Sequence, residues 1–140
     1  ELQQRLARKA GRFQPTAPLK GKLVLTSSFG PRFIFGGWSN HGGIDLAANW
    51  GDPVLAIEHG TVIHAGYDEL YGYRIVLDHG GGISSWYAHN QELLVKVGDE
   101  VRQGQTIARA GSTGLSTGPH LHLEIRVNGE RVDPLEYINL

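Results

Sequence analysis

The chain is a succession of short segments rich in Val, Ile, Leu, Thr and aromatic residues, with glycines between them. Glycine makes up 20 of the 140 residues, about twice the share found in an average protein. Because β-branched and aromatic residues favour strands and glycine favours tight turns, this pattern predicts many short strands. The predicted strands cover residues 22–30, 54–66, 73–80, 83–89, 105–111 and 121–127.

Two glycine-bounded segments are similar to each other and indicate an internal repeat. GDPVLAIEHGTVIHAG (51–66) and GDEVRQGQTIARAG (98–111) share a Gly-Asp-x-Val opening, a β-type run and an Ala-Gly close. We therefore predict an all-β fold, a mostly antiparallel sandwich or barrel with duplicated units of the hybrid-barrel kind. Short helices are expected at the N-terminus and near the C-terminus, where Asp133 can cap a first turn that begins with Pro134.

Residues 1–20 differ from the rest of the chain. Leu2, Leu6 and Ala10 follow helical spacing, and Gly11 stands where a helix would end. A linker-like stretch, QPTAP, follows at 14–18. The sequence therefore predicts a helical tail and linker from an upstream region over residues 1–20, and one domain over residues 21–140.

The composition argues against several classes of function. The formal net charge is −1, so no basic surface favours binding to nucleic acid. The chain has no cysteine, which excludes thiolate metal sites, disulfides and a cysteine nucleophile. No apolar run approaches the ~18 residues of a membrane span, and the polar start is unlike a signal peptide. If the parent protein is exported, we expect its signal upstream of this sequence.

The segment GPHLHLEI (118–125) combines a strand pattern with two histidines. Side chains at i and i+2 of a strand leave the same face. His120, His122 and Glu124 should therefore point one way, while Leu121, Leu123 and Ile125 face the core.

A second histidine lies in NHGGIDLA (40–47), four residues before Asp45. Gly42 and Gly43 disfavour a helix here, so we expect a loop that enters a strand and lets His41 and Asp45 converge. Alone, this spacing fits a solvated loop equally well. Combined with the paired histidines, it suggests two histidines and one aspartate around a catalytic zinc that leaves a fourth position open.

The remaining histidines are interpreted individually. In SSWYAHN (84–90), alternation places Ser85, Tyr87 and His89 on one face, and His89 is either structural or a base beside the metal. His59 and His64 are expected to be ordinary turn or surface residues, and His79 to be structural in a hairpin.

Assembled, these segments resemble the LytM/lysostaphin-type zinc metallopeptidases, which cut peptide cross-bridges of bacterial peptidoglycan. The resemblance runs from about Thr26 to Ile138, and it is specific because several motifs occur in the family's order. These motifs are TSSFGPR, HGGID, GDPVLAIEHGTV, VLDHGGG, WYAH, VGDEVRQGQTIARAGSTGLSTGPHLH and DPLEYI.

The resemblance implies a role for each site residue. It places one zinc per chain on His41, Asp45 and His122, and it assigns catalysis to His89 and His120. In such sites zinc polarises the scissile carbonyl and activates a water molecule. The implied substrate is a stem or cross-bridge peptide of peptidoglycan, and the implied location is the periplasm, cell envelope or exterior. Asn90 departs from the apolar or hydroxyl residue of many relatives, which affects local detail.

Three alternatives were weighed. Some relatives have lost zinc ligands and bind peptidoglycan or activate other hydrolases, but all five positions are filled here. Lipoyl or biotinyl carriers would need a lysine at a hairpin tip, and a sugar-permease phosphocarrier has no use for Asp45.

The six aromatic residues Trp38, Trp50, Trp86, Tyr67, Tyr71 and Tyr73 are expected mostly in the core rather than along a groove. The sequence leaves open the scissile bond and the oligomeric state.

Overall fold

The computed structural model describes residues 13–34 and 36–140, and it confirms an all-β fold built from antiparallel strands. The predicted N-terminal helix lies outside these described residues. The strands are β1 (Leu25–Ser27), β2 (Gly30–Ile34), β3 (Gly37–His41), β4 (Ile44–Ala47), β5 (Pro53–Leu55), β6 (Gly60–Asp68), β7 (Gly72–Gly80), β8 (Ile83–Leu93), β9 (Glu100–Val101), β10 (Thr106–Ala110), β11 (His120–Val127) and β12 (Glu130–Val132).

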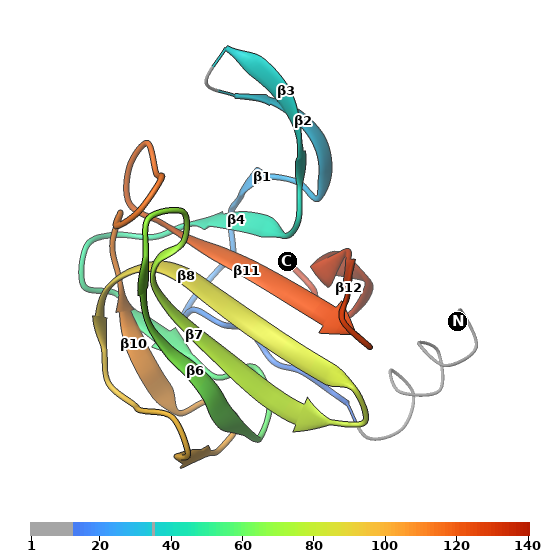
Figure 1. The fold of residues 1–140 in the computed structure, drawn as a ribbon, viewed down its shortest axis with the longest axis vertical. Helices are drawn as coiled ribbons and strands as arrows, with labels where there is room; N and C mark the ends of the chain where they lie inside the picture. The colour runs from blue at the N-terminus through green and yellow to red at the C-terminus, as the bar shows by residue number, and fades with distance from the viewer. Residues whose placement is uncertain (1–12, 35) are drawn as a thin grey trace.

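Most strands belong to one curved sheet, in the order β1-β4-β11-β8-β7-β6-β9 (Figure 1). β12 extends this sheet by pairing with β11, and β10 joins it to β5 by pairing with both β5 and β8. β4, β11 and β8 are therefore direct neighbours, although their positions in the sequence are far apart. This adjacency brings the histidine-bearing segments together.

The two repeat units pair with each other. β5 and β6 come from the first unit and β9 and β10 from the second, and the sheet pairs β5 with β10 and β6 with β9. The Gly-Asp openings also share a turn, because the side chains of Asp52 and Asp99 each accept a hydrogen bond from the backbone three residues earlier. The repeated sequence thus encodes a repeated turn.

The core lies behind β11 and β8. Leu121, Leu123 and Ile125 have no exposed surface, which confirms the predicted alternation of β11. Burying each such side chain contributes about 1.5–3 kcal/mol to folding. Because these alternate residues of β11 are packed in the core, the backbone that carries His120 and His122 on the other face is held in position.

The predicted C-terminal turn is confirmed as a short 3₁₀-helix, Pro134–Glu136. Asp133 caps this helix, since its side chain accepts a hydrogen bond from the backbone of Leu135. The described residues contain no helix with the length and hydropathy needed to cross a membrane.

Residues 13–20 pack on the domain. Phe13 is buried against Tyr137, with ring centroids 5.6 Å apart. The backbone N–H of Leu55 donates to the carbonyl oxygen of Pro18 at 2.7 Å. Leu19 also joins the hydrophobic core. The division of the chain at residue 20 stays a prediction, but this part of the expected linker is firmly attached.

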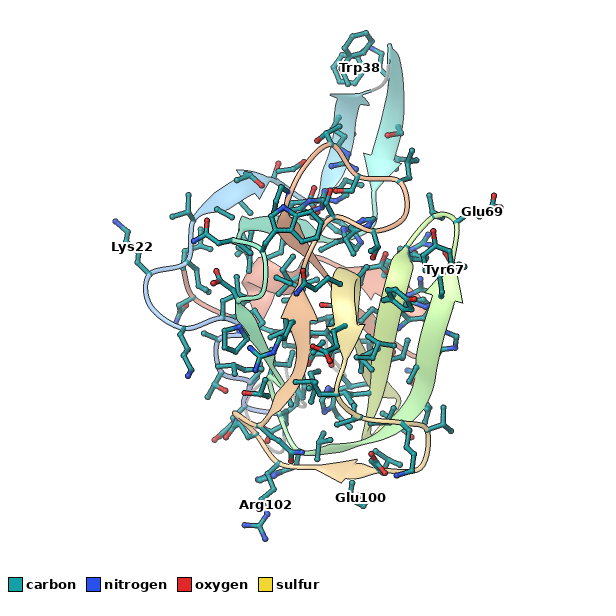
Figure 2. The ribbon with its side chains drawn as sticks, turned by 90° about the vertical axis from the view of Figure 1, so that its left-hand side faces the viewer. Lys22, Trp38, Tyr67, Glu69, Glu100 and Arg102 are labelled. Carbon is teal, nitrogen blue, oxygen red and sulfur yellow. The ribbon has the colours of Figure 1, made fainter. Side chains whose placement is uncertain are left out.

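β2 and β3 form a separate hairpin that stands out from the body (Figures 1 and 2). No pattern in the sequence predicted this hairpin. Phe33 and Trp38 pair across it with ring centroids 5.6 Å apart, and Figure 2 shows Trp38 at its far end.

The expectation of a core position is wrong for the six aromatic residues. Trp38, Trp50, Tyr67 and Tyr73 are exposed, and Tyr71 and Trp86 are partly buried. Among the described residues, the buried core consists mainly of aliphatic side chains, and its buried aromatic members are Phe13, Tyr87 and Tyr137.

Candidate metal centre

Three strands deliver the predicted metal ligands to one point. His41 ends β3, Asp45 lies on β4 and His122 lies on β11, where it stands opposite Asp45 in the sheet register. The two glycines of HGGID make this approach possible. A Cβ at Gly43 would overlap the carbonyl oxygen of Leu123, so a larger residue would force β4 away from β11.

The three ligand atoms face one another closely. His41 Nε2 lies 3.0 Å from His122 Nδ1 and 3.1 Å from Asp45 Oδ1, and His122 Nδ1 lies 2.9 Å from the same oxygen. Ligands bound tetrahedrally at ~2.0–2.1 Å would be about 3.3 Å apart. The three residues therefore form a possible metal site with nearly the required spacing.

The far nitrogen of each ligand histidine donates to a fixed acceptor. His41 Nδ1 donates to the carbonyl oxygen of Ser28 at 2.9 Å, and His122 Nε2 donates to Glu124 Oε1 at 3.0 Å. When both rings are neutral, each facing nitrogen therefore carries a lone pair beside a carboxylate oxygen. A cation at this point relieves their mutual repulsion, so the donor set fits a divalent metal.

Asp45 is fixed and ionised. Arg32 Nη1 donates to its second oxygen, Oδ2, at 2.9 Å, which leaves Oδ1 directed at the two histidines. Burial alone would raise the pKa of Asp45, but hydrogen bonds and charges from His122 and His41 lower it well below its usual range. The carboxylate is therefore ready to bind a cation at neutral pH.

His122 behaves differently without a cation. Burial alone would lower its pKa, but hydrogen bonds and charges from Asp45 and Glu124 raise it above the usual value. Metal must then displace a proton from this ring, because only the neutral imidazole ligates. Metal affinity should consequently weaken in acid.

The two predicted catalytic histidines lie beside this group. His120 Nδ1 donates to the carbonyl oxygen of Gly118 at 2.9 Å, and its Nε2 lies 3.6 Å from Asp45 Oδ1. His89 Nδ1 donates to the carbonyl oxygen of Thr113 at 2.6 Å, and its ring centroid lies 4.8 Å from that of His120. All five predicted site residues are thus brought together.

His89 reaches the site through an irregular backbone, and its predicted face was wrong. Ser85 and Tyr87 point into the core, where their hydroxyl groups are hydrogen-bonded to each other. His89 has φ 65°, and the pairing of β8 shifts register between Tyr87 and Asn90. Such a bulge redirects a side chain. The Asn90 side chain stabilises it by donating to the carbonyls of Tyr73 and Tyr87, both at 3.0 Å.

His89 is neutral at neutral pH. Burial lowers its pKa to about 4, with a further contribution from the nearby His120 and His122 rings, while its bond to Thr113 opposes the shift. Because its Nδ1 is committed as a donor, Nε2 carries a free lone pair. This nitrogen can accept a proton or a hydrogen bond.

The site lies in a groove of about 640 Å³. The hairpin side chains of Arg32 and Phe33 line one part of the groove, and Tyr71 and Leu115 line others. The sequence did not predict the roles of Arg32 and Tyr71. Neither residue stands at a spacing that indicates a function, and only the arginine of the TSSFGPR motif could have drawn attention to Arg32. Glu124 was placed on the correct face without a function.

His59 and His64 lie in a turn and on a partly exposed strand position, as expected, and His79 has hydrogen bonds that suit the expected structural role. His64 contacts Arg74, and His59 accepts a hydrogen bond from the backbone of Gln103. His79 links the turn before β6 to β8, with Nδ1 2.7 Å from the His59 carbonyl oxygen and Nε2 2.7 Å from Ser85 Oγ.

Comparisons with known proteins agree with this geometry. The model of peptidase family M23 matches residues 39–134. The lipoprotein NlpD/LppB homologue of Pseudomonas aeruginosa is 45% identical over 86% of this chain, and peptidoglycan DD-endopeptidase ShyC of Vibrio cholerae is 39% identical over 84%. The chain spans 38% and 28% of these two proteins. The catalytic domain of lysostaphin from Staphylococcus simulans superposes with TM-score 0.76 at 37% identity, covering 82% of this chain and 91% of that domain.

Proposed function

The chain belongs to peptidase family M23, and we propose that it is a zinc-dependent endopeptidase that hydrolyses peptide cross-links of bacterial peptidoglycan. The observation that carries this proposal is the convergence of two histidine lone pairs and one carboxylate oxygen, with two further histidines beside them.

His41, Asp45 and His122 would hold the zinc. A bound zinc supplies Lewis acidity, which polarises the scissile carbonyl and makes water a better nucleophile. Asp45 contributes negative charge, and Arg32 keeps its second oxygen engaged so that the carboxylate does not rotate. The chain's own contribution at this point is a rigid, pre-oriented set of donors.

His89 and His120 would act on the reacting groups. His89 is neutral at neutral pH and can accept a proton at Nε2. His120 borders the ligand group through its own Nε2. Between them they can orient the nucleophile, donate a hydrogen bond to the tetrahedral oxyanion and transfer a proton to the leaving amine.

The names of relatives support the substrate class and location. One is a peptidoglycan endopeptidase and another a lipoprotein homologue, so we propose that the protein works in the periplasm or cell envelope. The groove is lined by Arg32 and Phe33 of the hairpin and by Tyr71, and we propose that an extended peptide binds between them. A D-alanyl bond to diaminopimelate is the favoured target, because the ShyC relative is a DD-endopeptidase.

A second candidate is a non-catalytic module that binds peptidoglycan and activates other hydrolases. The observation in its favour is the 45% identity to a protein that bears a lipoprotein name and no enzyme name. The complete set of five residues favours the enzyme.

Digestion of intact peptidoglycan sacculi, with mass analysis of the released fragments, separates the two candidates. The zinc-loaded protein should release cross-bridge cleavage products whose new termini identify the scissile bond. His89→Ala should release none, although it leaves the three proposed ligands intact. Binding to sacculi without new fragments from the zinc-loaded parent would favour the module.

A further inference from the structure

Glu124 is a carboxylate with only 2% of its surface exposed, and the proposed function gives it no role. It follows His122 by two residues on β11, so both side chains leave the strand on the same face. Burying an ionised carboxylate costs several kcal/mol unless hydrogen bonds and charges compensate. The contacts around Glu124 therefore indicate what it does.

Its first contact is with a proposed zinc ligand. Glu124 Oε1 accepts a hydrogen bond from His122 Nε2 at 3.0 Å. The proton of the neutral ring is thereby held on Nε2, and Nδ1 presents its lone pair to Asp45 Oδ1 and His41 Nε2. We infer that Glu124 is a positioning residue that fixes the tautomer and orientation of His122 for metal binding.

Glu124 is itself held from two sides. The hydroxyl of Tyr71 donates to Oε1 at 2.9 Å. Arg126 donates to Oε2 through both Nη2, at 2.8 Å, and Nε, at 3.1 Å. This forked contact restricts both the position and the plane of the carboxylate. The hydrogen bond to His122 is consequently directed rather than incidental.

Arg126 is in turn fixed by Trp86. Its guanidinium carbon lies 3.6 Å from the centroid of the Trp86 ring, and Trp86 stands opposite Glu124 in the register of β8 and β11. Trp86, Arg126, Glu124 and His122 therefore form one continuous array on the groove face of the sheet. Arg131 approaches Glu124 only to 3.6 Å and donates to the Tyr71 hydroxyl at 3.4 Å, and it is half exposed, so its contacts are longer than those of Arg126 and weakened by solvent.

The two ligand histidines differ in a way that makes the inference testable. His41 donates to the backbone carbonyl of Ser28, which a side-chain substitution leaves in place. The corresponding hydrogen bond of His122 is accepted by the side chain of Glu124, which a substitution removes. Substitution of Glu124 therefore loosens one ligand and spares the other two.

The inference rests on the proposed zinc site, and zinc affinity measured by chelator competition tests it. Glu124→Leu removes the acceptor and should weaken zinc binding about 100-fold, whereas Glu124→Gln keeps an acceptor oxygen and should weaken it about 10-fold. Arg126→Gln removes the forked contact to the Glu124 carboxylate, and its zinc affinity should be close to that of Glu124→Gln. The visible absorption of bound Co²⁺ should change in Glu124→Leu, because the ligand geometry changes.

Two matched variants separate positioning from general stability. Ile125→Val weakens the same strand on its core face, and Arg131→Gln removes a charge near Glu124 without touching His122. Both should bind zinc within twofold of the parent and keep its cobalt spectrum. If Glu124→Leu does not fold, Glu124→Gln and Arg126→Gln carry the test.

Zinc affinity within twofold of the parent in folded Glu124→Gln and Arg126→Gln would overturn the positioning role while leaving the metal site intact. A parent that binds no zinc would overturn the metal site and the inference together. Because binding is measured directly, a protein that binds zinc without cutting peptidoglycan would still support the inference and contradict only the peptidase activity.

Discussion

His122 Nδ1 lies 3.0 Å from His41 Nε2, although 81 positions separate the two residues in the chain. Each ring donates through its other nitrogen, so its facing nitrogen can bind a cation beside Asp45 once any proton on that nitrogen has left. Packing of the sheet imposes this proximity, because β4 joins the strand of His122 to the loop of His41. We therefore expect bound metal to contribute to both the stability and the activity of the protein.

Substitution of the five site residues, four histidines and one aspartate, should divide them into two groups. His122→Ala should lose both bound zinc and turnover, because it removes a ligand. His89→Ala and His120→Ala should retain most of the metal and lose turnover about 100-fold or more. Zinc per chain after dialysis and the rate of fragment release measure the two effects.

Release of zinc from His120→Ala as readily as from His122→Ala would show that His120 is a ligand. The 3.6 Å distance from His120 Nε2 to Asp45 Oδ1 makes this the sharpest comparison within the group.

Removal of metal should lower the thermal stability of the parent. A ligand that binds only the folded state stabilises it by about 2.7 kcal/mol at a hundredfold excess over its dissociation constant. A chelator should therefore lower Tm by several degrees and abolish peptidoglycan hydrolysis, and added zinc should restore both. His122→Ala serves as the control, since its Tm should not respond to the chelator.

Gly43→Ala and Gly42→Ala should differ strongly although the substitutions are identical. At Gly43 the new methyl group would overlap the backbone carbonyl of Leu123, so β4 and β11 would have to separate and zinc affinity should fall with stability. At Gly42 the nearest atom is the side-chain Cδ of Arg131 at 2.6 Å, and this half-exposed arginine can move. Urea unfolding and chelator competition measure both variants, and an equal loss in both would contradict the steric argument.

His79 should make stability depend on pH. Burial lowers its pKa below 6.5, although its hydrogen bond to the His59 carbonyl opposes the shift. The unfolded chain therefore takes up a proton at His79 at a higher pH than the folded chain does. The stability that the folded state gains from neutral His79 is complete above about pH 6.5. It is lost as the pH falls from there toward the lowered pKa of His79 in the folded state.

Urea unfolding with chelator present should show a larger loss between pH 7.5 and 5 for the parent than for His79→Gln. The variant should be about 1–2 kcal/mol less stable at pH 7.5, because it loses hydrogen bonds with Ser85 and His59. If the free energy of unfolding depended on pH equally in the two proteins, His79 would not be the source of the pH dependence.

Local patterns predicted most of the architecture. Alternation along residues 120–125 correctly separated Leu121 and Leu123 from His122, because the twofold period of a strand is a local property of the backbone. The repeat around Asp52 and Asp99 correctly indicated related β units, since its turns are closed by local hydrogen bonds. The order of motifs predicted the five residues that converge.

Other features were decided by contacts between distant segments. Alternation predicted the wrong face for His89, because a bulge with φ 65° turns its side chain toward His120. No local pattern distinguishes that bulge from a continuous strand. The β2–β3 hairpin was missed for a related reason, since its Phe33 and Trp38 are exposed and leave no buried stripe in the sequence.

The sequence by itself determined most of the strands, the inward face of β11 and the identity of the chemical groups, because these depend on residue type and on spacing of a few positions. Only the tertiary structure decided which nitrogen of each histidine is free, since that depends on acceptors such as Ser28, Thr113 and Glu124. Two of these acceptors are backbone carbonyls, which every residue carries and no sequence pattern marks. The placement of protons at the site is therefore a property of the folded chain.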